Sequence, residues 1–201
     1  MARRKDHSPQ ELKEAIRAAA EKIIYAKGLN GLTARALAAK IGYTPGTIYN
    51  FFRDMDAIVT EVNYATLKRL YDHCLEKLKG ARPGHEAIKS LAYAYIDFAH
   101  THERAWRTLF NEANRNALPA KLPVHYQQCI TDLFELIETT MQKNLNIAAG
   151  EAAHAARLLW ACMHGITSLM LDGRLAFIGI EQPHMIVDDL LNKYLKDYAK
   201  G

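Results

Sequence analysis

The stretch Leu32–Phe52, which reads LTARALAAKIGYTPGTIYNFF, predicts two short helices joined by a tight turn. Thr33 is suited to cap the first helix, because its hydroxyl can accept a hydrogen bond from an early backbone N–H. Leu37 and Ile41 are four residues apart and give this helix one apolar side. Gly42 can adopt the left-handed conformation that ends a helix. The stretch therefore opens with a short helix that stops at a glycine turn.

The second helix of the stretch follows directly after the turn. Thr44 stands at its N-cap position, and Pro45 stands at its first helical position, where a missing N–H costs nothing. Ile48, together with Phe51 or Phe52, can bury one side. The polar side chains left to face outward are Thr47, Tyr49 and Asn50. Two short helices around a glycine turn, with exposed hydrogen-bonding groups on the second, are the layout of a DNA-reading helix-turn-helix.

This stretch resembles the DNA-binding domain of TetR-family transcriptional repressors. The family pattern is Gly, then Thr-x-Arg-x-(Leu/Ile)-Ala, then Gly-x-(Ser/Thr)-x-(Gly/Pro)-Thr-(Leu/Ile)-Tyr-x-(Tyr/His)-Phe. The matching residues are Gly31, Thr33, Arg35, Leu37, Ala38, Gly42, Thr44, Gly46, Thr47, Ile48, Tyr49 and Phe52. The chain departs from the pattern at Met55, where the family usually has Lys. Arg53 is the nearest residue that could replace that phosphate contact.

The resemblance implies that this segment binds operator DNA. The predicted groove contacts are Thr47, Tyr49 and Asn50, with Thr44, Pro45 and Gly46 at the leading end of the recognition helix. The predicted phosphate contacts are Thr33, Arg35, Lys40 and Arg53.

Composition favours an all-α protein. The chain has 201 residues, of which 49% are hydrophobic, and this is enough for one large or two small domains with a sizeable core. Helix-forming residues dominate, and only six prolines and eleven glycines interrupt long stretches of helical periodicity. We predict a three-helix DNA-binding domain followed by a helical domain for ligand binding and dimerisation, with about nine helices in all.

The positive charge is concentrated at the N-terminal end. Residues 1–56 carry ten Lys and Arg against six Asp and Glu, whereas residues 57–201 carry sixteen of each. A basic module on a neutral body is typical of a protein held on phosphates by counterion release. The alternative is a solvated basic face without a partner. We predict domain boundaries of 1–54 for the reader and 55–201 for the regulatory domain.

The three cysteines, Cys74, Cys129 and Cys162, are widely spaced and odd in number. Neither a disulfide framework nor a zinc site is predicted, and a reducing cytoplasm fits this usage. The charged N-terminus has no apolar signal core. Arg3, Arg4 and Lys5 form either an arm that reaches DNA or a disordered tail.

Capping signals and periodicity predict the remaining helices. Ser8 should cap a first helix that ends at Lys27, and Asp54 should cap a long helix over Met55–Leu78 that connects reader and body. The other predicted helices are Glu86–Thr101, Glu103–Asn114, Val124–Asn144, Gly150–Asp172 and Pro183–Ala199. Part of the fourth of these, Ala152–Leu171, is apolar on nearly every side. Because it contains Arg157 and His164, it is predicted to be a buried helix and not a membrane span.

Residues of the helical body suggest a small-molecule site. Trp160-Ala-Cys-Met-His164-Gly165 resembles the Trp-x-x-x-His-Gly signature of one class of TetR-family C-terminal domains. Tyr93, Asp97 and His100 share a helix face and, with nearby aromatic residues, could line an apolar cavity with a few polar groups. The predicted ligand-binding residues are Tyr93, Asp97, His100, Trp106, Phe110, Trp160 and His164. Plain core packing is the alternative explanation for them.

Neither a metal nor another cofactor is predicted. His100 and His102 are two residues apart, so on a helix they point away from each other and do not form a metal site. An enzyme using His100, Asp97, Tyr93 or His164 is the remote alternative, since the chain has no recognisable nucleophile elbow, phosphate loop or metal-ligand spacing.

The favoured function is a transcriptional repressor that a small, mainly apolar ligand releases from its operator. A DNA-binding protein without a switch remains an alternative, but the body after Gly80 is larger than a dimerisation element needs. A homodimer is predicted through the last two long helices, as a four-helix bundle across a twofold axis. The apolar stripe predicted on the final helix is Met185, Ile186, Leu190, Leu191 and Leu195.

Overall fold

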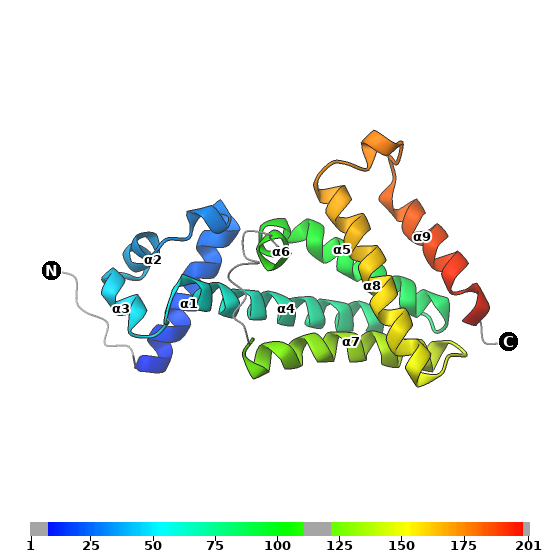
Figure 1. Cartoon of the computed structure of the whole chain (residues 1–201), viewed down its shortest axis with the longest axis horizontal. Coiled ribbons are helices and arrows are strands. Elements are labelled where there is room, and N and C mark those ends of the chain that lie inside the picture. Colours follow the sequence, from blue (N-terminus) through cyan, green and yellow to red (C-terminus); the bar gives the residue numbers. More distant parts are fainter. Residues whose placement is uncertain (1–7, 111–121, 199–201) are drawn as a thin grey trace. The chain divides into compact units, whose positions relative to one another are not determined.

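A computed structural model describes residues 8–110 and 122–198 (Figure 1). Every regular element in these ranges is a helix, which confirms the all-α prediction. The elements are α1 (Pro9–Lys27), η1 (Leu29–Gly31), α2 (Ala34–Ile41), α3 (Pro45–Tyr49), α4 (Met55–Lys79), α5 (His85–Thr101), α6 (Glu103–Phe110), α7 (Val124–Asn144), α8 (Ala149–Leu171), η3 (Ala176–Ile178), α9 (Pro183–Tyr194) and η4 (Lys196–Tyr198).

The contacts divide the chain into two compact units. Unit 1 comprises Met1–Thr66 and Arg104–Pro123, and unit 2 comprises Leu67–Glu103 and Val124–Gly201. The long helix α4 therefore has residues in both units. We retain residues 1–54 and 55–201 as the proposed functional division, because the recognition segment ends just before α4 begins.

Unit 1 is built on α1, which packs against α2, and α2 packs against α3. The start of α1 is fixed by a capping box: the Ser8 hydroxyl accepts from the Glu11 N–H at 3.3 Å, and the Glu11 carboxylate accepts from the Ser8 N–H at 2.7 Å. The buried core residues are Leu12, Ile16, Ala19, Ala20, Ile23, Ile24, Leu37, Ala38, Ile48, Phe52, Ile58 and Val62.

Two glycines are needed around α2. Gly42 ends the helix with φ of 77°, in the left-handed region that favours glycine. Gly31, just before the helix, lies so close to α1 that an added Cβ would stand 2.5 Å from the Cβ of Lys27. Thr33 caps α2 as predicted, with its hydroxyl accepting from the Ala36 N–H at 3.1 Å.

Thr44 occupies the N-cap position of α3 but makes no side-chain bond to the backbone there. Its Oγ1 lies 3.1 Å from Oγ1 of Thr47 instead. Thr44 thus stands at the predicted N-cap position, with its hydroxyl paired to that of Thr47 and not to the backbone.

Residues far apart in the sequence also meet within unit 1. The guanidinium of Arg104, at the start of α6, donates to the carbonyl of Tyr25 at 3.0 Å and to that of Ala26. These carbonyls lie at the C-terminal end of α1, where a cation is favoured by the helix dipole. Arg104 thus fastens α6 to α1.

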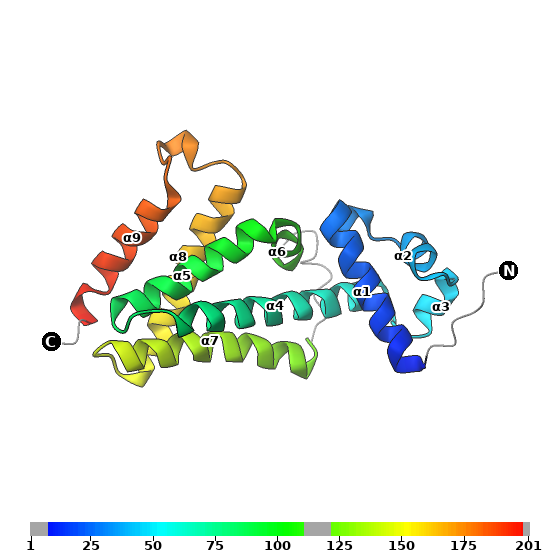
Figure 2. The same cartoon turned by 180° about the vertical axis from the view of Figure 1, so that it is seen from behind.

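Unit 2 is organised around α5, which packs against α7, α8 and α9 (Figure 2). α7 also packs against α8, and α8 against α9. The end of α4 is tied to α5 by the Ser90 hydroxyl, which donates to the Lys77 carbonyl at 3.1 Å. The turn before α5 is held by the Gly84 N–H, which donates to the Asn144 side chain at 2.8 Å.

The final helix is shorter than predicted. α9 ends at Tyr194 and is followed by η4, whose Tyr198 carbonyl accepts from the Asn146 N–H at 2.9 Å. This bond to the loop before α8 diverts the backbone from a continued helix. The predicted residues Arg3, Arg4, Lys5 and Ala199 and the predicted helix end at Asn114 lie outside the described residues. None of the helices described is long and apolar enough to cross a membrane.

Candidate DNA-reading surface and effector pocket

The predicted DNA contacts lie on α2, on α3 and in the segments next to them, all within unit 1. The exposed residues among them are Thr33, Arg35, Lys40, Thr44, Pro45, Gly46, Tyr49, Asn50 and Arg53, while Thr47 is half-buried. Exposure leaves their polar groups available to a partner.

One side of the recognition helix α3 packs on the core of unit 1, and another side is polar and exposed. Ile48 is fully buried and Phe52 is 5% exposed, so this side of the segment is fixed to the core of unit 1. Tyr49, the next residue after Ile48, is 49% exposed. An exposed phenol on an anchored helix can donate to or accept from base edges in a groove.

Arg53 stands close to the start of α4. Its Nε donates to Oδ2 of Asp54 at 2.7 Å, and the other oxygen of Asp54 accepts from the Ala57 N–H at 2.8 Å. The bond from Ala57 and the bond from Arg53 hold the pKa of Asp54 below its usual value. A guanidinium has five N–H donors, so Arg53 retains donors that could reach a phosphate.

Met55, which stands where the TetR family usually has Lys, packs against the apolar core of unit 1. An apolar side chain at this position therefore adds to the core, and it offers no charge to a phosphate.

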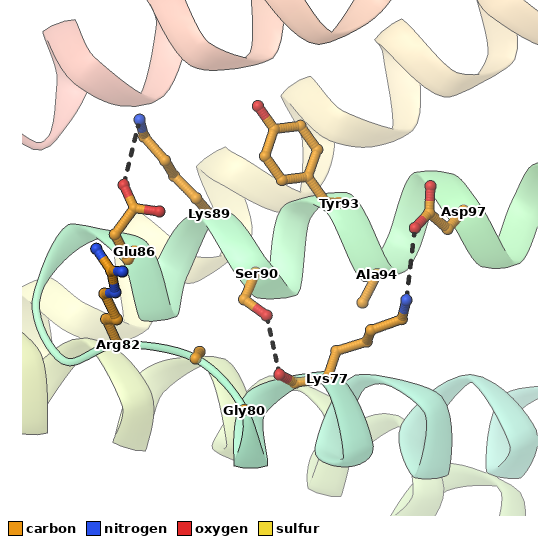
Figure 3. Close-up of a pocket in the computed structure, with 10 residues that line it drawn as sticks. Lys77, Gly80, Arg82, Glu86, Lys89, Ser90, Tyr93, Ala94 and Asp97 are labelled. Atoms are coloured by element: carbon orange, nitrogen blue, oxygen red, sulfur yellow. Dashed lines mark hydrogen bonds and ion pairs between the residues drawn. The ribbon is translucent and has the colours of Figure 1, made fainter.

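Unit 2 contains a pocket of about 360 Å³ beside α5 (Figure 3). It is lined by Lys77, Gly80, Ala81, Arg82, Glu86, Lys89, Ser90, Tyr93, Ala94 and Asp97. Tyr93 and Asp97 are thus brought together as predicted, but charged side chains surround them where the sequence predicted an apolar cavity. His100, one turn later on α5, is exposed and is not part of this lining.

Tyr93 also connects α5 to α9. Its hydroxyl is hydrogen-bonded to Asp188, and its ring meets that of His184 at a centroid distance of 5.3 Å. Burial and the nearby carboxylate raise the pKa of Tyr93, so the phenol is protonated at neutral pH. Nζ of Lys89 lies 3.3 Å from the carboxylate of Asp188 as well.

Trp160 and His164 belong to an aromatic cluster elsewhere in unit 2. Their rings stack at 5.4 Å, and Phe134 meets Trp160 edge-on at 5.8 Å. The Tyr95 hydroxyl lies 2.9 Å from Nδ1 of His164. Burial lowers the pKa of His164, which favours the neutral ring. This cluster combines apolar surface with one polar pair.

Trp106 and Phe110, the remaining predicted ligand residues, lie on α6 within unit 1. Their ring centroids are 4.9 Å apart, and Trp106 is 3% exposed. Six of the seven predicted ligand residues are therefore distributed over three groups, and His100 belongs to none of them.

Sequence reasoning missed several residues of these groups. Tyr95 and Phe134 were overlooked because nothing local separates a cluster aromatic from a core aromatic. Arg82 lies in the turn between α4 and α5, where the sequence predicts no site residue. Lys77 and Lys89 resembled ordinary solvent-facing lysines on helices.

The described residues contain no group of three or more His, Cys, Asp or Glu side chains placed to hold a metal ion. Cys74 and Cys129 are buried, and burial raises the pKa of the Cys74 thiol to about 12. That thiol is accordingly unreactive at neutral pH.

A short exposed recognition helix on a three-helix core, followed by a helical body, defines a helix-turn-helix transcriptional regulator. Residues 16–62 match the family model described as bacterial regulatory proteins, tetR family, and residues 88–194 match the tetracyclin repressor-like C-terminal domain. The chain belongs to the TetR family of transcriptional regulators, and is not an enzyme.

Relatives agree with this assignment. The uncharacterized HTH-type transcriptional regulator YobS of Bacillus subtilis (strain 168) is 30% identical over 153 residues, which cover 76% of this chain and 75% of YobS. A protein of unknown function from Rhodococcus sp. RHA1 has the same fold, with a TM-score of 0.77, 20% identity and full coverage of both chains. The TetR-family regulator PfmR from Thermus thermophilus aligns with a TM-score of 0.63 and 16% identity, over 90% of this chain and 97% of PfmR.

Proposed function

We propose that this regulator is a cytoplasmic homodimeric repressor that leaves its operator when a small, mainly apolar molecule binds its regulatory domain. The observation that carries the DNA-binding half is the anchored, exposed recognition helix. Ile48 fixes α3 to the core while Tyr49 and Asn50 remain exposed and can meet a groove. Arg35, Lys40 and Arg53 supply exposed positive charge for phosphates.

The dimer is supported by an uncharged, exposed stripe on α8. Leu158 and Leu169 are 42% and 40% exposed, and the exposed residues between them at helical spacing are Ala161 and Gly165. Small residues allow another helix to approach closely, and apolar ones gain from leaving water. A twofold axis through this stripe would pair α8 and α9 with their counterparts in a four-helix bundle.

The effector site is supported by the aromatic cluster of α5, α7 and α8. Trp160, Phe134 and Tyr95 supply apolar surface, and the Tyr95–His164 pair supplies hydrogen bonding. Pockets for drug-sized ligands have this composition. Of the seven predicted ligand residues, Trp160 and His164 belong to this cluster. Tyr93, Asp97, His100, Trp106 and Phe110 lie outside it.

The test begins with selection of an operator from random duplexes by the full-length protein. Fluorescence anisotropy then compares the selected duplex with a scrambled one at moderate salt. We expect tight binding to the first alone. Equal affinity for the two would contradict specific recognition. Compounds are next screened for release of the selected duplex, and Trp160→Ala should lose this release while it keeps operator affinity.

The alternative of an unregulated DNA-binding protein makes a different prediction in the same experiment. No compound that binds the regulatory domain would then change operator affinity. Binding of each compound to the protein is measured separately by calorimetry. A compound that does not bind is thereby distinguished from one that binds without changing operator affinity.

A further inference from the structure

The pocket beside α5 differs from the aromatic cluster in its chemistry. Figure 3 shows charged side chains along its length, with Arg82 and Glu86 toward one end and Asp97 at the other. Glu86 and Asp97 are eleven positions apart on α5, which corresponds to about 16 Å along the helix axis. The lining includes three cations and two carboxylates. This is an elongated site with an excess of positive charge.

The cations of the pocket differ in how they are neutralised. Lys89 lies 3.6 Å from Glu86 and 3.3 Å from Asp188, and its side chain is only 16% exposed. Lys77 lies 3.8 Å from Asp97. Arg82 is exposed at the end of the pocket that also holds Glu86, and among the described residues no ion pair within 4 Å neutralises it. An anionic group is therefore most favoured beside Arg82.

The opposite end of the pocket carries a weakly held carboxylate. The side chains of Asp97 and Lys77 are each 49% exposed, and their separation is at the long limit of an ion pair. Exposed pairs of this kind contribute little to stability, so an incoming donor can replace the lysine at small cost. Between the two ends lie the buried Ala94 and Ser90, whose hydroxyl donates to the Lys77 carbonyl and can still accept a hydrogen bond.

We propose that this pocket binds a small linear molecule with a carboxylate at one end and an ammonium or another strong donor at the other. Arg82 would receive the carboxylate, because the guanidinium presents paired donors that match its two oxygens. Asp97 would accept from the ligand's donor. The site is distinct from the aromatic cluster proposed for an apolar effector.

Occupation of the pocket has a structural consequence for α4. Lys77 belongs to the last turns of α4, and Gly80 and Arg82 to the turn that follows, whereas Ser90 and Asp97 belong to α5. A ligand that contacts both sets holds the end of α4 against α5. Any effect on operator affinity rests on the proposed function, but binding itself does not.

Calorimetry on the full-length protein at low salt, without DNA, tests the binding. The probes are aminohexanoate, hexanoate without the ammonium, aminohexanamide without the carboxylate, and inorganic phosphate. We expect aminohexanoate to bind most tightly and aminohexanamide most weakly. Absence of binding by aminohexanoate, or tighter binding of phosphate, overturns the proposal.

Three variants separate the pocket from general electrostatics. Arg82→Gln should weaken aminohexanoate at least tenfold, as expected for a lost charge-assisted pair. Lys79→Gln removes the same charge three residues away and outside the pocket lining, and should leave affinity unchanged. Equal losses in the two variants overturn the proposed site. Asp97→Asn should weaken aminohexanoate but not hexanoate.

A final measurement keeps this proposal separate from the proposed function. Operator affinity is measured with and without saturating aminohexanoate. A change in affinity that Arg82→Gln abolishes supports a regulatory role for the pocket. An unchanged affinity overturns that role, while the calorimetric result still decides the binding. Failure to find any operator would instead contradict the proposed function.

Discussion

Tyr49 is the side chain on which sequence recognition is expected to depend most. It is 49% exposed on a helix whose neighbouring residue, Ile48, is fully buried. Tyr49→Ala should weaken operator binding by about 1–3 kcal/mol, the cost of a lost base-edge contact. The fold should be retained, because little of the phenol is packed. Anisotropy measures the affinity and thermal unfolding the fold; unchanged operator affinity in a folded variant would falsify this role.

Arg35 should contribute equally to the binding of all DNA sequences. Its side chain is exposed on α2, and it is proposed to meet a phosphate. Arg35→Ala should weaken operator and random duplex to the same extent, and should reduce the slope of log affinity against log salt by about one. Lys22→Ala, an exposed lysine of α1 outside the proposed contacts, is the control. A selective loss for the operator would assign Arg35 to base reading instead.

Partly buried histidines should make the fold sensitive to acid. Burial lowers the pKa of His164, and it does the same for His73 and His102. Because these rings bind protons more readily in the unfolded chain, their contribution is fully present above the ordinary value of 6.5 and is lost as the pH falls below it.

The acid effect can be followed by the melting temperature. Between about pH 7.5 and pH 5.5 it should fall, and His164→Gln should make this fall smaller, because the ring no longer titrates. The variant also loses the contact with Tyr95, so only the pH dependence, and not the absolute stability, is diagnostic. An identical pH dependence in the two proteins would show that His164 does not contribute.

At the scale of the element, the turn between α2 and α3 depends on one glycine. Gly42 has φ of 77°, and an added Cβ would meet nothing within 4 Å, so the cost of Gly42→Ala is conformational. We expect a loss of about 1–2 kcal/mol. For a chain of this length the melting temperature should fall by about 2–4 °C per kcal/mol.

Gly46 provides the matched control within the same motif. It does not have a positive φ, and its nearest contact for an added Cβ is Oγ1 of Thr44 at 3.9 Å. Gly46→Ala should therefore keep or slightly raise stability while it reduces operator affinity by crowding the DNA side of α3. If Gly46→Ala destabilises the protein as much as Gly42→Ala, backbone conformation is not the cause.

At the scale of the whole molecule, the dimer depends on residues that the folded chain leaves uncovered. Leu191 and Leu195 belong to the stripe predicted on the final helix, but they are 1% and 0% exposed within the single chain. A charge there would disrupt the fold itself. Leu158 and Leu169 are the suitable positions, since both are exposed on α8.

Leu158→Glu combined with Leu169→Glu should therefore give folded monomers. An obligate interface buries about 2,000 Å² or more. Two glutamates at its centre would be buried without a partner for their charges, which strongly disfavours association. Val124→Glu is the control, because Val124 is 77% exposed on α7, outside the proposed bundle. Sedimentation velocity measures the assembly. A double variant that sediments as a dimer would place the interface elsewhere.

The helices were largely predictable from local signals in the sequence. The Ser8 capping box, Asp54 and the Gly42 turn fix where α1, α4 and α2 begin or end, and the structure has them at these places. Predictions failed where a distant group intervened. The Tyr198 carbonyl accepts from the backbone N–H of Asn146, and α9 stops early.

The candidate sites, like the helices, were predictable where their residues are neighbours in the sequence and not where distant segments meet. The recognition segment is contiguous, so its apolar anchor and exposed face follow from one helical period. Tyr93 and Tyr95 show the limit of this reasoning, because two positions on one helix point to different neighbours: Asp188 on α9 and His164 on α8. Periodicity within α5 indicates that these faces differ, but not which helix each one meets.

The amino-acid sequence by itself determined the all-helical class, most helix limits and the DNA-reading motif, because caps, glycine turns and apolar spacing act over a few residues. Only the tertiary structure decided which side chains form a pocket. Arg82 and Asp97 line one pocket because α5 lies against the end of α4, and Tyr95 meets His164 across 69 residues of sequence because α5 packs on α8. Such encounters depend on the rotation and depth at which helices pack, and these are set by the side chains of both partners together.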